Sequence, residues 1–187
     1  GLQHLRVHGG DNREELARAR LALDLAALGR RVLLVSSGDP GVFAMASAVF
    51  EALDDASPEE HQRWAQVDIE VLPGITAMLA AAARLGAPLG HDFCVINLSD
   101  NLKPAALIAH RIRLAAQADL AMAFYNPCSK SRPLGFEQAL AVLREECEGE
   151  RLLCFARNVS RPHEQLQVHA LKDVHGGMTH MRRRVRR

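Results

Sequence analysis

The hydrophobic pattern of this chain changes repeatedly between a helical period and short, uninterrupted apolar runs. The stretch "NREELARARLALDLAALG" (12–29) predicts a helix with a clean start and stop. Asp11 or Asn12 is its candidate N-cap, and Gly29 is the stop. The apolar residues that share one face of this helix are Leu16, Ala19, Leu23, Ala26 and Ala27.

Two apolar runs rich in β-branched residues predict buried strands in the first half of the chain. They are "RRVLLVSS" (30–37) and "VDIEVLP" (67–73). Helical spacing returns in "GVFAMASAVFEAL" (41–53), a polar loop follows at "DDASPEEHQ" (54–62), and "GITAMLAAAARLGAP" (74–88) predicts an alanine-rich helix. This alternation of helices and strands implies a parallel sheet with crossover helices.

The second half of the chain repeats this alternation of helices and strands. "HDFCVINLSD" (91–100), "DLAMAFYNP" (119–127) and "RLLCFARNVS" (151–160) predict strands, and "PAALIAHRIRLAAQA" (104–118) and "GFEQALAVLREEC" (135–147) predict helices. "EQLQVHALKDV" (164–174) adds a last strand and a turn. A boundary near residue 90 divides the chain into two α/β lobes, 1–90 and 91–187, with mainly parallel sheets.

The charge distribution argues against a nucleic-acid partner. The 187 residues carry a formal net charge of +1, and five arginines lie in the last ten residues, "MTHMRRRVRR". The rest of the chain therefore sums to about −4 (1 − 5). No basic surface remains in the body of the protein to follow a phosphate backbone.

Cysteine and histidine spacing gives no metal or disulfide signature. Cys94, Cys128, Cys147 and Cys154 stand singly without a CxxC pair, and the nine histidines show no HExxH spacing. No apolar run reaches the roughly 20 residues that span a bilayer, and the first 15 residues lack the apolar core of a signal peptide. We therefore predict a cytoplasmic protein with reduced thiols, no metal and no membrane partner.

Four loops follow predicted strands: "SSGDPGV" (36–42), "LPGITA" (72–77), "FYNPCSK" (124–130) and "ARNVSRP" (156–162). Ligands of open parallel sheets bind outside the carboxyl ends of the strands, so these loops are the candidate binding region. "SSGDPGV" is neither a P-loop, because no GK[ST] follows, nor a GxGxxG fingerprint.

Each loop also has a purely structural interpretation. Asp39 is a candidate cap of the following helix, Thr76 is a candidate N-cap or first-turn residue, and "YNP" is a common turn. Against these stands a ligand held by close backbone approach at Gly38 and Gly41. Cys128 is an unpromising nucleophile because no general-base motif accompanies it.

Taken together, the loops are more specific than any one alone. The succession "VSSGDPGVFAMA", "VLPGITAMLAAAARLGAPLGHDFCVINLSD", "AFYNPCSKSRP" and "ARNVSRPHE" resembles the tetrapyrrole methylases of cobalamin biosynthesis, from residue 11 to about 168. "SSGDPGVFAMA" and "LGHDFCVINLSD" resemble in particular the members that methylate C17 of precorrin-3B and contract the ring to precorrin-4.

This resemblance implies a cytoplasmic homodimer of two α/β lobes that binds S-adenosylmethionine in a cleft between the lobes, with a tetrapyrrole as the small-molecule substrate. Carried over by position, the methyl-donor contacts fall on eight residues: Ser37, Gly38, Asp39, Val42, Thr76, Ala77, Asn126 and Asn158. Cationic partners for the carboxylate arms of the substrate are sought among Arg84, His91, Lys103, Lys130, Arg132 and Arg161, for most of which a solvated surface charge is the favoured interpretation.

The resemblance departs from the family at both ends. A first strand with a GxGPG loop is expected before residue 1, and "DVHGGMTHMRRRVRR" does not resemble the family's final strand. We expect such a strand and loop to improve donor affinity roughly 30- to 150-fold through two or three backbone hydrogen bonds. Two alternatives stay open at this point: another enzyme of the superfamily, such as one acting on a different corrin precursor or a diphthine synthase, and a non-catalytic α/β binding module.

Overall fold

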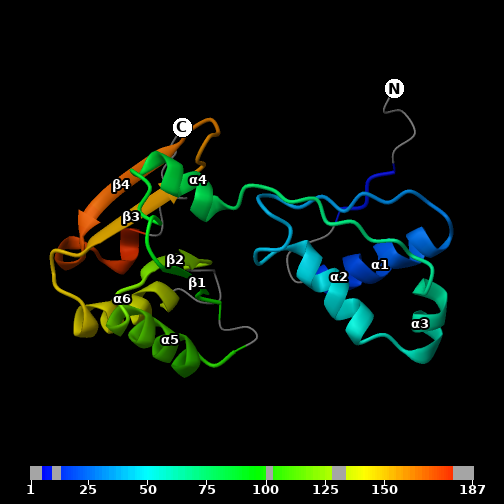
Figure 1. Cartoon of the computed structure of the whole chain (residues 1–187), viewed down its shortest axis with the longest axis horizontal. Helices are drawn as coiled ribbons and strands as arrows, with labels where there is room; N and C mark the ends of the chain where they lie inside the picture. Colours follow the sequence, from blue (N-terminus) through cyan, green and yellow to red (C-terminus); the bar gives the residue numbers. More distant parts are fainter. Residues whose placement is uncertain (1–5, 10–13, 100–102, 128–133, 179–187) are drawn as a thin grey trace. The chain divides into compact units, whose positions relative to one another are not determined.

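The computed structural model describes residues 6–9, 14–99, 103–127 and 134–178 (Figure 1). Its chain separates into two compact units, residues 1–76 and 77–187. The lobe boundary predicted near residue 90 lies beyond this division, so the alanine-rich helix belongs to the second unit. As a statement about the domains of the enzyme, that boundary stays a prediction.

The first unit contains three helices in its described part: α1 (Glu15–Ala27), α2 (Met45–Asp54) and α3 (Pro58–Trp64). The predicted apolar face of α1 is buried at Ala19 and Leu23 and half-buried at Ala26 and Ala27, but Leu16 is exposed. The proposed caps Asp11 and Asn12 lie outside the described residues. The core of the unit consists of Ala19, Leu23, Met45, Ala48, Val49, Ala52 and Trp64.

Helix α3 lies where the sequence pattern predicts a polar loop, so that prediction is wrong. It begins with a capping box: the Ser57 hydroxyl accepts from the backbone N–H of Glu60 at 3.2 Å, and the Glu60 carboxylate accepts from the backbone N–H of Ser57 at 2.9 Å. Pro58 occupies the first helical position, where its fixed φ and missing N–H cost nothing. The Ser-Pro-x-Glu pattern therefore carried the signal for this helix.

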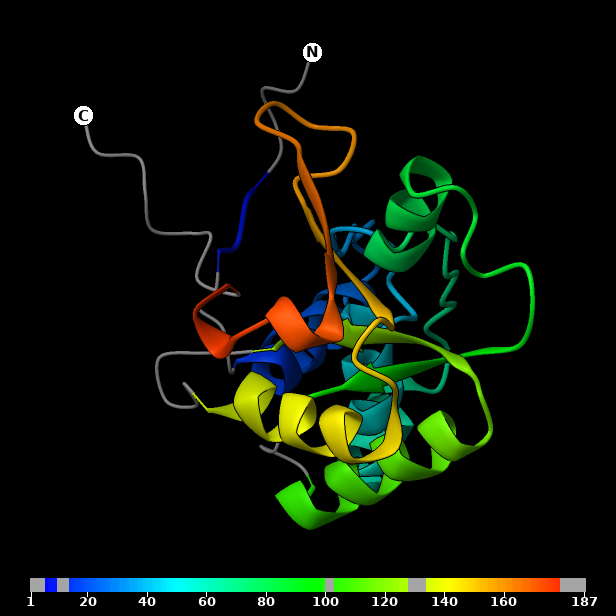
Figure 2. The same ribbon diagram turned by 90° about the vertical axis from the view of Figure 1, so that its left-hand side faces the viewer.

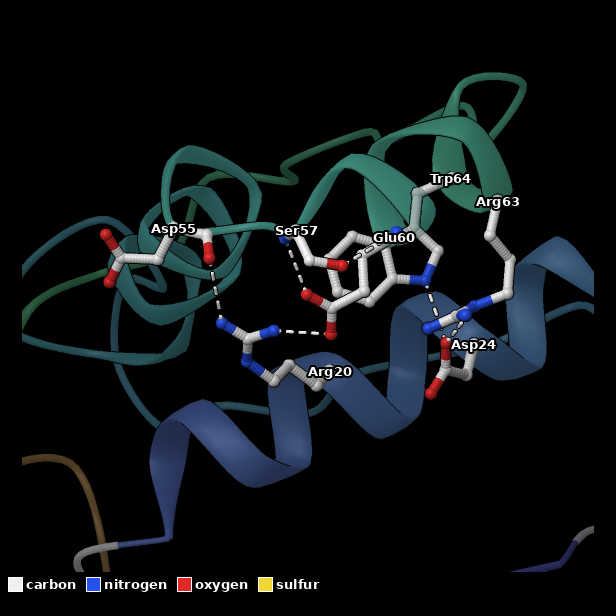
Figure 3. A network of polar contacts seen from close by, with 7 residues as sticks. All are labelled: Arg20, Asp24, Asp55, Ser57, Glu60, Arg63 and Trp64. Carbon is white, nitrogen blue, oxygen red and sulfur yellow. Dashed lines mark hydrogen bonds and ion pairs between the residues drawn. The ribbon is translucent and has the colours of Figure 1, made fainter.

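Arg20 ties α1 to the start of α3, as Figure 3 shows. Its guanidinium donates to the Glu60 carboxylate at 2.5 Å and to the backbone carbonyl of Asp55 at 3.3 Å. The hydrogen bond from Arg20 is the main cause that holds the pKa of Glu60 below its ordinary value. Glu60 therefore caps α3 and contacts α1 with the same carboxylate.

A second contact between these helices involves the only tryptophan of the chain. The Trp64 indole is 3% exposed and donates to the Asp24 carboxylate at 2.8 Å, which also accepts from Nε of Arg63 at 2.9 Å (Figure 3). The guanidinium carbons of Arg20 and Arg63 lie 5.9 and 5.6 Å from the indole ring centroid, within cation–π range. Apolar burial and polar contacts thus fix α3 on α1 together.

The two strands predicted in the first unit are not formed among its described residues. Residues 30–36 and 66–76 contain neither helix nor strand. Leu33 and Val35 are 80% and 77% exposed rather than buried. A strand requires a hydrogen-bonded neighbour, and neither segment pairs with one in the described part of this unit.

The second unit contains the remaining elements. In chain order these are α4 (Ala77–Arg84), β1 (Phe93–Asn97), α5 (Ala105–Gln117), β2 (Ala121–Tyr125), α6 (Gly135–Glu146), β3 (Leu152–Arg157), β4 (Gln165–Ala170) and the short 3-10 helix η1 (Leu171–Asp173). Each of the helices and strands predicted for this half of the chain is confirmed, with ends shifted by a few residues.

Strands β1 and β2 pair in parallel, with Phe93 opposite Ala121 and Asn97 opposite Tyr125. Figures 1 and 2 show α5 and α6 side by side along one face of this pair. The parallel β-α-β arrangement therefore places the residues that follow β1 and β2 at the same sheet edge. The core of the unit includes Ile96, Leu98, Ile108, Ile112, Phe136, Leu140, Leu143, Leu171 and Val174.

Strands β3 and β4 pair antiparallel, with Leu152 opposite Ala170 and Arg157 opposite Gln165. Phe155 of β3 contacts Phe136 of α6 edge to face, with ring centroids 5.7 Å apart. The predicted α/β class and its parallel pairing are confirmed. The expectation of mainly parallel sheets is too simple for the described residues, which form one parallel and one antiparallel pair.

Candidate functional site

The Asp39 carboxylate links two predicted site loops of the first unit. Its Oδ1 accepts from the backbone N–H of Gly41 at 2.8 Å, within "SSGDPGV". Its Oδ2 accepts from the backbone N–H of Gly74 at 3.0 Å, within "LPGITA". Both carboxylate oxygens are therefore used to hold one loop against the other.

Glycine permits the close approach of these loops. A Cβ on Gly74 would overlap the carbonyl oxygen of Gly38. Gly38 itself has φ = +77°, in the left-handed region, and a Cβ there would lie 3.6 Å from the carbonyl oxygen of Ile75. The predicted need for glycine at position 38 is confirmed, whereas the role of Gly74 was not anticipated.

The capping interpretation of Asp39 is wrong. Helix α2 begins at Met45 after Ala44, and no side chain caps it. The Asp39 side chain instead makes a local turn and the contact to Gly74. Asp39 is therefore a residue that positions loops rather than one that terminates a helix.

The other predicted donor contacts of these loops differ in exposure. Ser37 is exposed and Val42 is half-buried. Thr76 directly precedes α4 and is 5% exposed, and Ala77 is the exposed first residue of that helix. Thr76 is therefore the buried member of this set.

In the second unit, Tyr125 binds the start of α4. The Tyr125 hydroxyl accepts from the backbone N–H of Met78 at 2.8 Å, one of the N–H groups that lack a partner within a helix. Tyr125 is the last residue of β2 and Asn126 follows it. One strand end therefore carries both the anchor of α4 and a predicted donor contact.

Asn126 has φ = +52° and is exposed. Its side-chain amide Nδ2 donates to Oδ1 of Asn97 at 3.1 Å, and the same oxygen accepts from the backbone N–H of Ser99 at 2.9 Å. Asn97 ends β1, so the contact joins neighbouring residues at the carboxyl edge of the parallel pair. Asparagine tolerates the left-handed region better than most residues, which suits it to this turn.

Asn158 holds a similar place after β3, with φ = +51°. Its loop is held by Glu164, whose carboxylate accepts from the backbone N–H of Ser160 at 2.6 Å and from Nη2 of Arg84 in α4 at 2.9 Å. The hydrogen bond from Ser160, with the ion pair to Arg84, holds the pKa of Glu164 below its ordinary value. The loop after β3 is thereby attached to α4.

The candidate cations for substrate carboxylates separate into different groups. Arg84 is paired with Glu164, which gives it a structural role. His91 and Arg161 are exposed, and burial followed by the charge of Arg111 lowers the pKa of Lys103. Lys130 and Arg132 lie outside the described residues.

Cysteine and metal chemistry receives no support within the described ranges. Cys94, Cys147 and Cys154 are free thiols, and burial raises the pKa of Cys94 and Cys147. Cys128 falls outside these ranges. Among the described residues, no group of three or more histidine, cysteine, aspartate or glutamate side chains could hold a metal ion, and no helix has the length and apolarity to span a membrane.

The structure therefore brings together some of the predicted residues. In the first unit, Gly38, Asp39 and Thr76 lie on two loops in direct contact. In the second unit, Tyr125 connects the start of α4 to the strand end that carries Asn126. Asn158 instead donates from Nδ2 to the backbone carbonyl of His163 at 3.5 Å, within its own loop. Sequence reasoning missed the linking residues Gly74, Asn97, Tyr125 and Glu164, although Asn97 and Tyr125 occupy strand ends.

Known proteins are similar to this chain in sequence over most of its length. The chain is 52% identical to the precorrin-3B C(17)-methyltransferase of a Sinorhizobium species over 164 residues, covering 88% of this chain and 63% of that protein. It is 45% identical to the cobalamin biosynthesis protein CobIJ of Mycobacterium tuberculosis (strain ATCC 25618 / H37Rv) over 181 residues, covering 95% of this chain and 34% of that protein. The chain thus spans less than two thirds of the length of these relatives.

The fold comparison agrees with the sequence comparison. The crystal structure of the methyltransferase CobJ superposes with a TM-score of 0.85 at 61% sequence identity, covering 91% of this chain and 70% of that one. The family model described as Tetrapyrrole (Corrin/Porphyrin) Methylases matches residues 3–175. The chain therefore belongs to the tetrapyrrole (corrin/porphyrin) methylase family.

Proposed function

We propose that this chain carries the S-adenosylmethionine-dependent methylation of precorrin-3B at C17, with ring contraction to precorrin-4, in cobalamin biosynthesis. Family membership and the similarity to a precorrin-3B C(17)-methyltransferase support this reaction. The observation that carries the proposal is the Asp39 contact, which holds "SSGDPGV" against "LPGITA" with their backbones close together.

The chain's residues fit a methyl donor of this kind. In the first unit the proposed contacts are Ser37, Gly38, Asp39, Val42 and Thr76, and in the second unit Ala77, Asn126 and Asn158. Gly38 exposes its backbone without a side chain, and Asn126 offers an exposed amide, which suits a ligand bearing amino, hydroxyl and carboxylate groups. S-adenosylmethionine supplies a methyl group already activated on a sulfonium.

Transfer from a sulfonium needs positioning more than a strong nucleophile on the protein. The role of this chain is therefore to hold the donor at the correct distance and in line with the ring carbon, and to exclude water. The paired loops suit this role because Asp39 and Gly74 fix their separation. Arg161, His91 and Lys103 are the described candidates for the carboxylate arms of the tetrapyrrole.

The cellular setting follows from the same resemblance. We propose a cytoplasmic homodimer that acts on a tetrapyrrole, without a nucleic-acid or membrane partner. Light scattering after size-exclusion chromatography tests the dimer, and a monomer at all concentrations up to the high micromolar range would contradict it.

Two measurements test the function. Calorimetric titration with S-adenosylmethionine should show binding, and incubation of the donor with precorrin-3B should give a product heavier by one methylene unit and a molecule of S-adenosylhomocysteine. A binding module would bind no donor, and a different methylase of the family would bind donor but leave precorrin-3B unchanged.

Substitutions at Asp39 test whether the contact between the two loops matters for donor binding. Asp54→Ala, at an exposed position of α2, is their control variant.

A further inference from the structure

Asn97 and Asn126 are in contact at the carboxyl edge of the parallel strand pair. The parallel register sets Asn97 opposite Tyr125, so the residue after Tyr125 lies next to the end of β1. There Oδ1 of Asn97 accepts from Nδ2 of Asn126 at 3.1 Å. Asn97 is half-buried and Asn126 is exposed, so the inner amide supports the outer one.

The backbone N–H of Ser99 fixes the orientation of both side-chain amides. The backbone N–H of Ser99 can only donate, and it points at the Asn97 side chain at 2.9 Å, so the atom of Asn97 that meets it must be the oxygen. That oxygen then requires a donor from Asn126, which turns the NH₂ group of Asn126 inward. The amide oxygen of Asn126 is left to face other partners.

We propose that Asn97 is a positioning residue that makes Asn126 present a hydrogen-bond acceptor to the methyl donor. The ligand group bound at this place is then a donor group, such as an adenine amine, a ribose hydroxyl or an amino-acid ammonium. This inference rests on the proposed function, because it takes Asn126 as a contact of the methyl donor. It adds a residue and a polarity that the family resemblance does not supply.

Calorimetric titration of a set of variants tests whether Asn97 positions Asn126 for the methyl donor. Asn97→Ala should weaken S-adenosylmethionine binding about fivefold, the effect of losing one hydrogen bond of ordinary strength. Asn97→Asp keeps an oxygen that accepts from both Ser99 and Asn126, and should bind within about twofold of the unmodified chain. Ser99→Ala retains the backbone N–H and should leave the affinity unchanged.

A double-mutant cycle separates positioning from a general loss of structure. If Asn97 acts through Asn126, adding Asn97→Ala to Asn126→Ala should cause no further loss of affinity. Additive losses would mean that Asn97 acts independently, and would overturn the proposal. An Asn97→Ala variant that binds as tightly as the unmodified chain would overturn it equally.

A ligand-free measurement distinguishes this proposal from the function on which it rests. In nitrogen-15 NMR spectra, the side-chain amide signal of Asn126 should move in Asn97→Ala and stay in place in Asn97→Asp. An Asn126 signal that stays in place in both variants would refute the positioning role of Asn97. If the signal responds as expected but the unmodified chain binds no S-adenosylmethionine, the proposed function fails, and the role of Asn126 as a donor contact fails with it.

Discussion

The carboxylate of Asp39 accepts a hydrogen bond at 3.0 Å from the backbone N–H of Gly74, a residue 35 positions further along the chain. The contact is between two loops rather than between regular elements. Because the other carboxylate oxygen accepts from Gly41, Asp39 fixes its own loop while it holds the neighbouring one. This hydrogen bond therefore sets the distance between the two loops of the proposed donor site.

Asp39→Ala should reduce S-adenosylmethionine affinity about 30-fold. It removes both loop contacts, each worth about 1 kcal/mol, and each 1.4 kcal/mol corresponds to a factor of ten. Calorimetric titration measures the change, and circular dichroism confirms that the helices persist. Asp54→Ala should bind normally. Equal affinities in the two variants would show that the contact between the loops does not organise the site.

Gly74→Ala should disrupt donor binding more than its small size suggests. The added methyl would overlap the carbonyl oxygen of Gly38, so the two loops must separate. Gly90→Ala is the matched control, because a Cβ there would lie 3.6 Å from the nearest described atom, in ordinary contact. We expect at least a tenfold loss of affinity in Gly74→Ala and none in Gly90→Ala, both measured by calorimetry. An unaffected Gly74→Ala variant would contradict the close approach of the loops.

The stability of the first unit should fall in acid because of Glu60. The hydrogen bond from Arg20 lowers the pKa of Glu60, so its contribution is present above the ordinary glutamate pKa of about 4.3 and is lost as the pH falls through the lower value of the folded state. The fluorescence of Trp64, the only tryptophan, monitors unfolding by urea at each pH.

Substitution assigns this pH dependence to one group. Glu60→Gln should lower the stability at neutral pH and flatten its decline below about pH 4.3, because the titrating carboxylate is gone. Glu51→Gln, at an exposed position of α2, should leave the pH profile unchanged. If Glu60→Gln keeps the full acid dependence, other carboxylates are responsible for it.

The two halves of the chain differ in how far their sequence predicted their structure. In the second unit, the apolar runs at β1 and β2 pair with each other, so the local pattern and the long-range pairing agree. In the first unit, Leu33 and Val35 carry the same kind of apolar signal but lack a paired strand among the described residues, and they remain exposed. Periodicity reports what a segment is suited to form, whereas a strand also depends on its neighbour.

The site shows the same limit at the level of single residues. Gly38 was predictable, because a glycine-rich turn after an apolar run indicates a special backbone conformation. Gly74 and Asn97 act through partners 35 and 29 residues away, and no local pattern encodes such a distance. The candidate role of Asp39 as a helix cap is wrong, and its contact with Gly74 could not be predicted because it depends on how the two loops meet.

Tyr125→Phe should loosen the start of α4 while leaving the fold intact. The change removes only the hydroxyl that accepts from the backbone N–H of Met78, so that this partly buried N–H loses a partner worth about 1 kcal/mol. We expect a loss of that size in the free energy of urea unfolding, together with faster amide hydrogen exchange at Met78. Because Ala77 begins the same helix, donor affinity should also fall by a few-fold.

Phe124→Leu, one position earlier in β2, is the control variant. It should lower stability through lost packing without a selective change in hydrogen exchange at Met78. If exchange at Met78 is unchanged in Tyr125→Phe, the hydroxyl does not anchor α4, and the strand end and the helix are held together by packing alone.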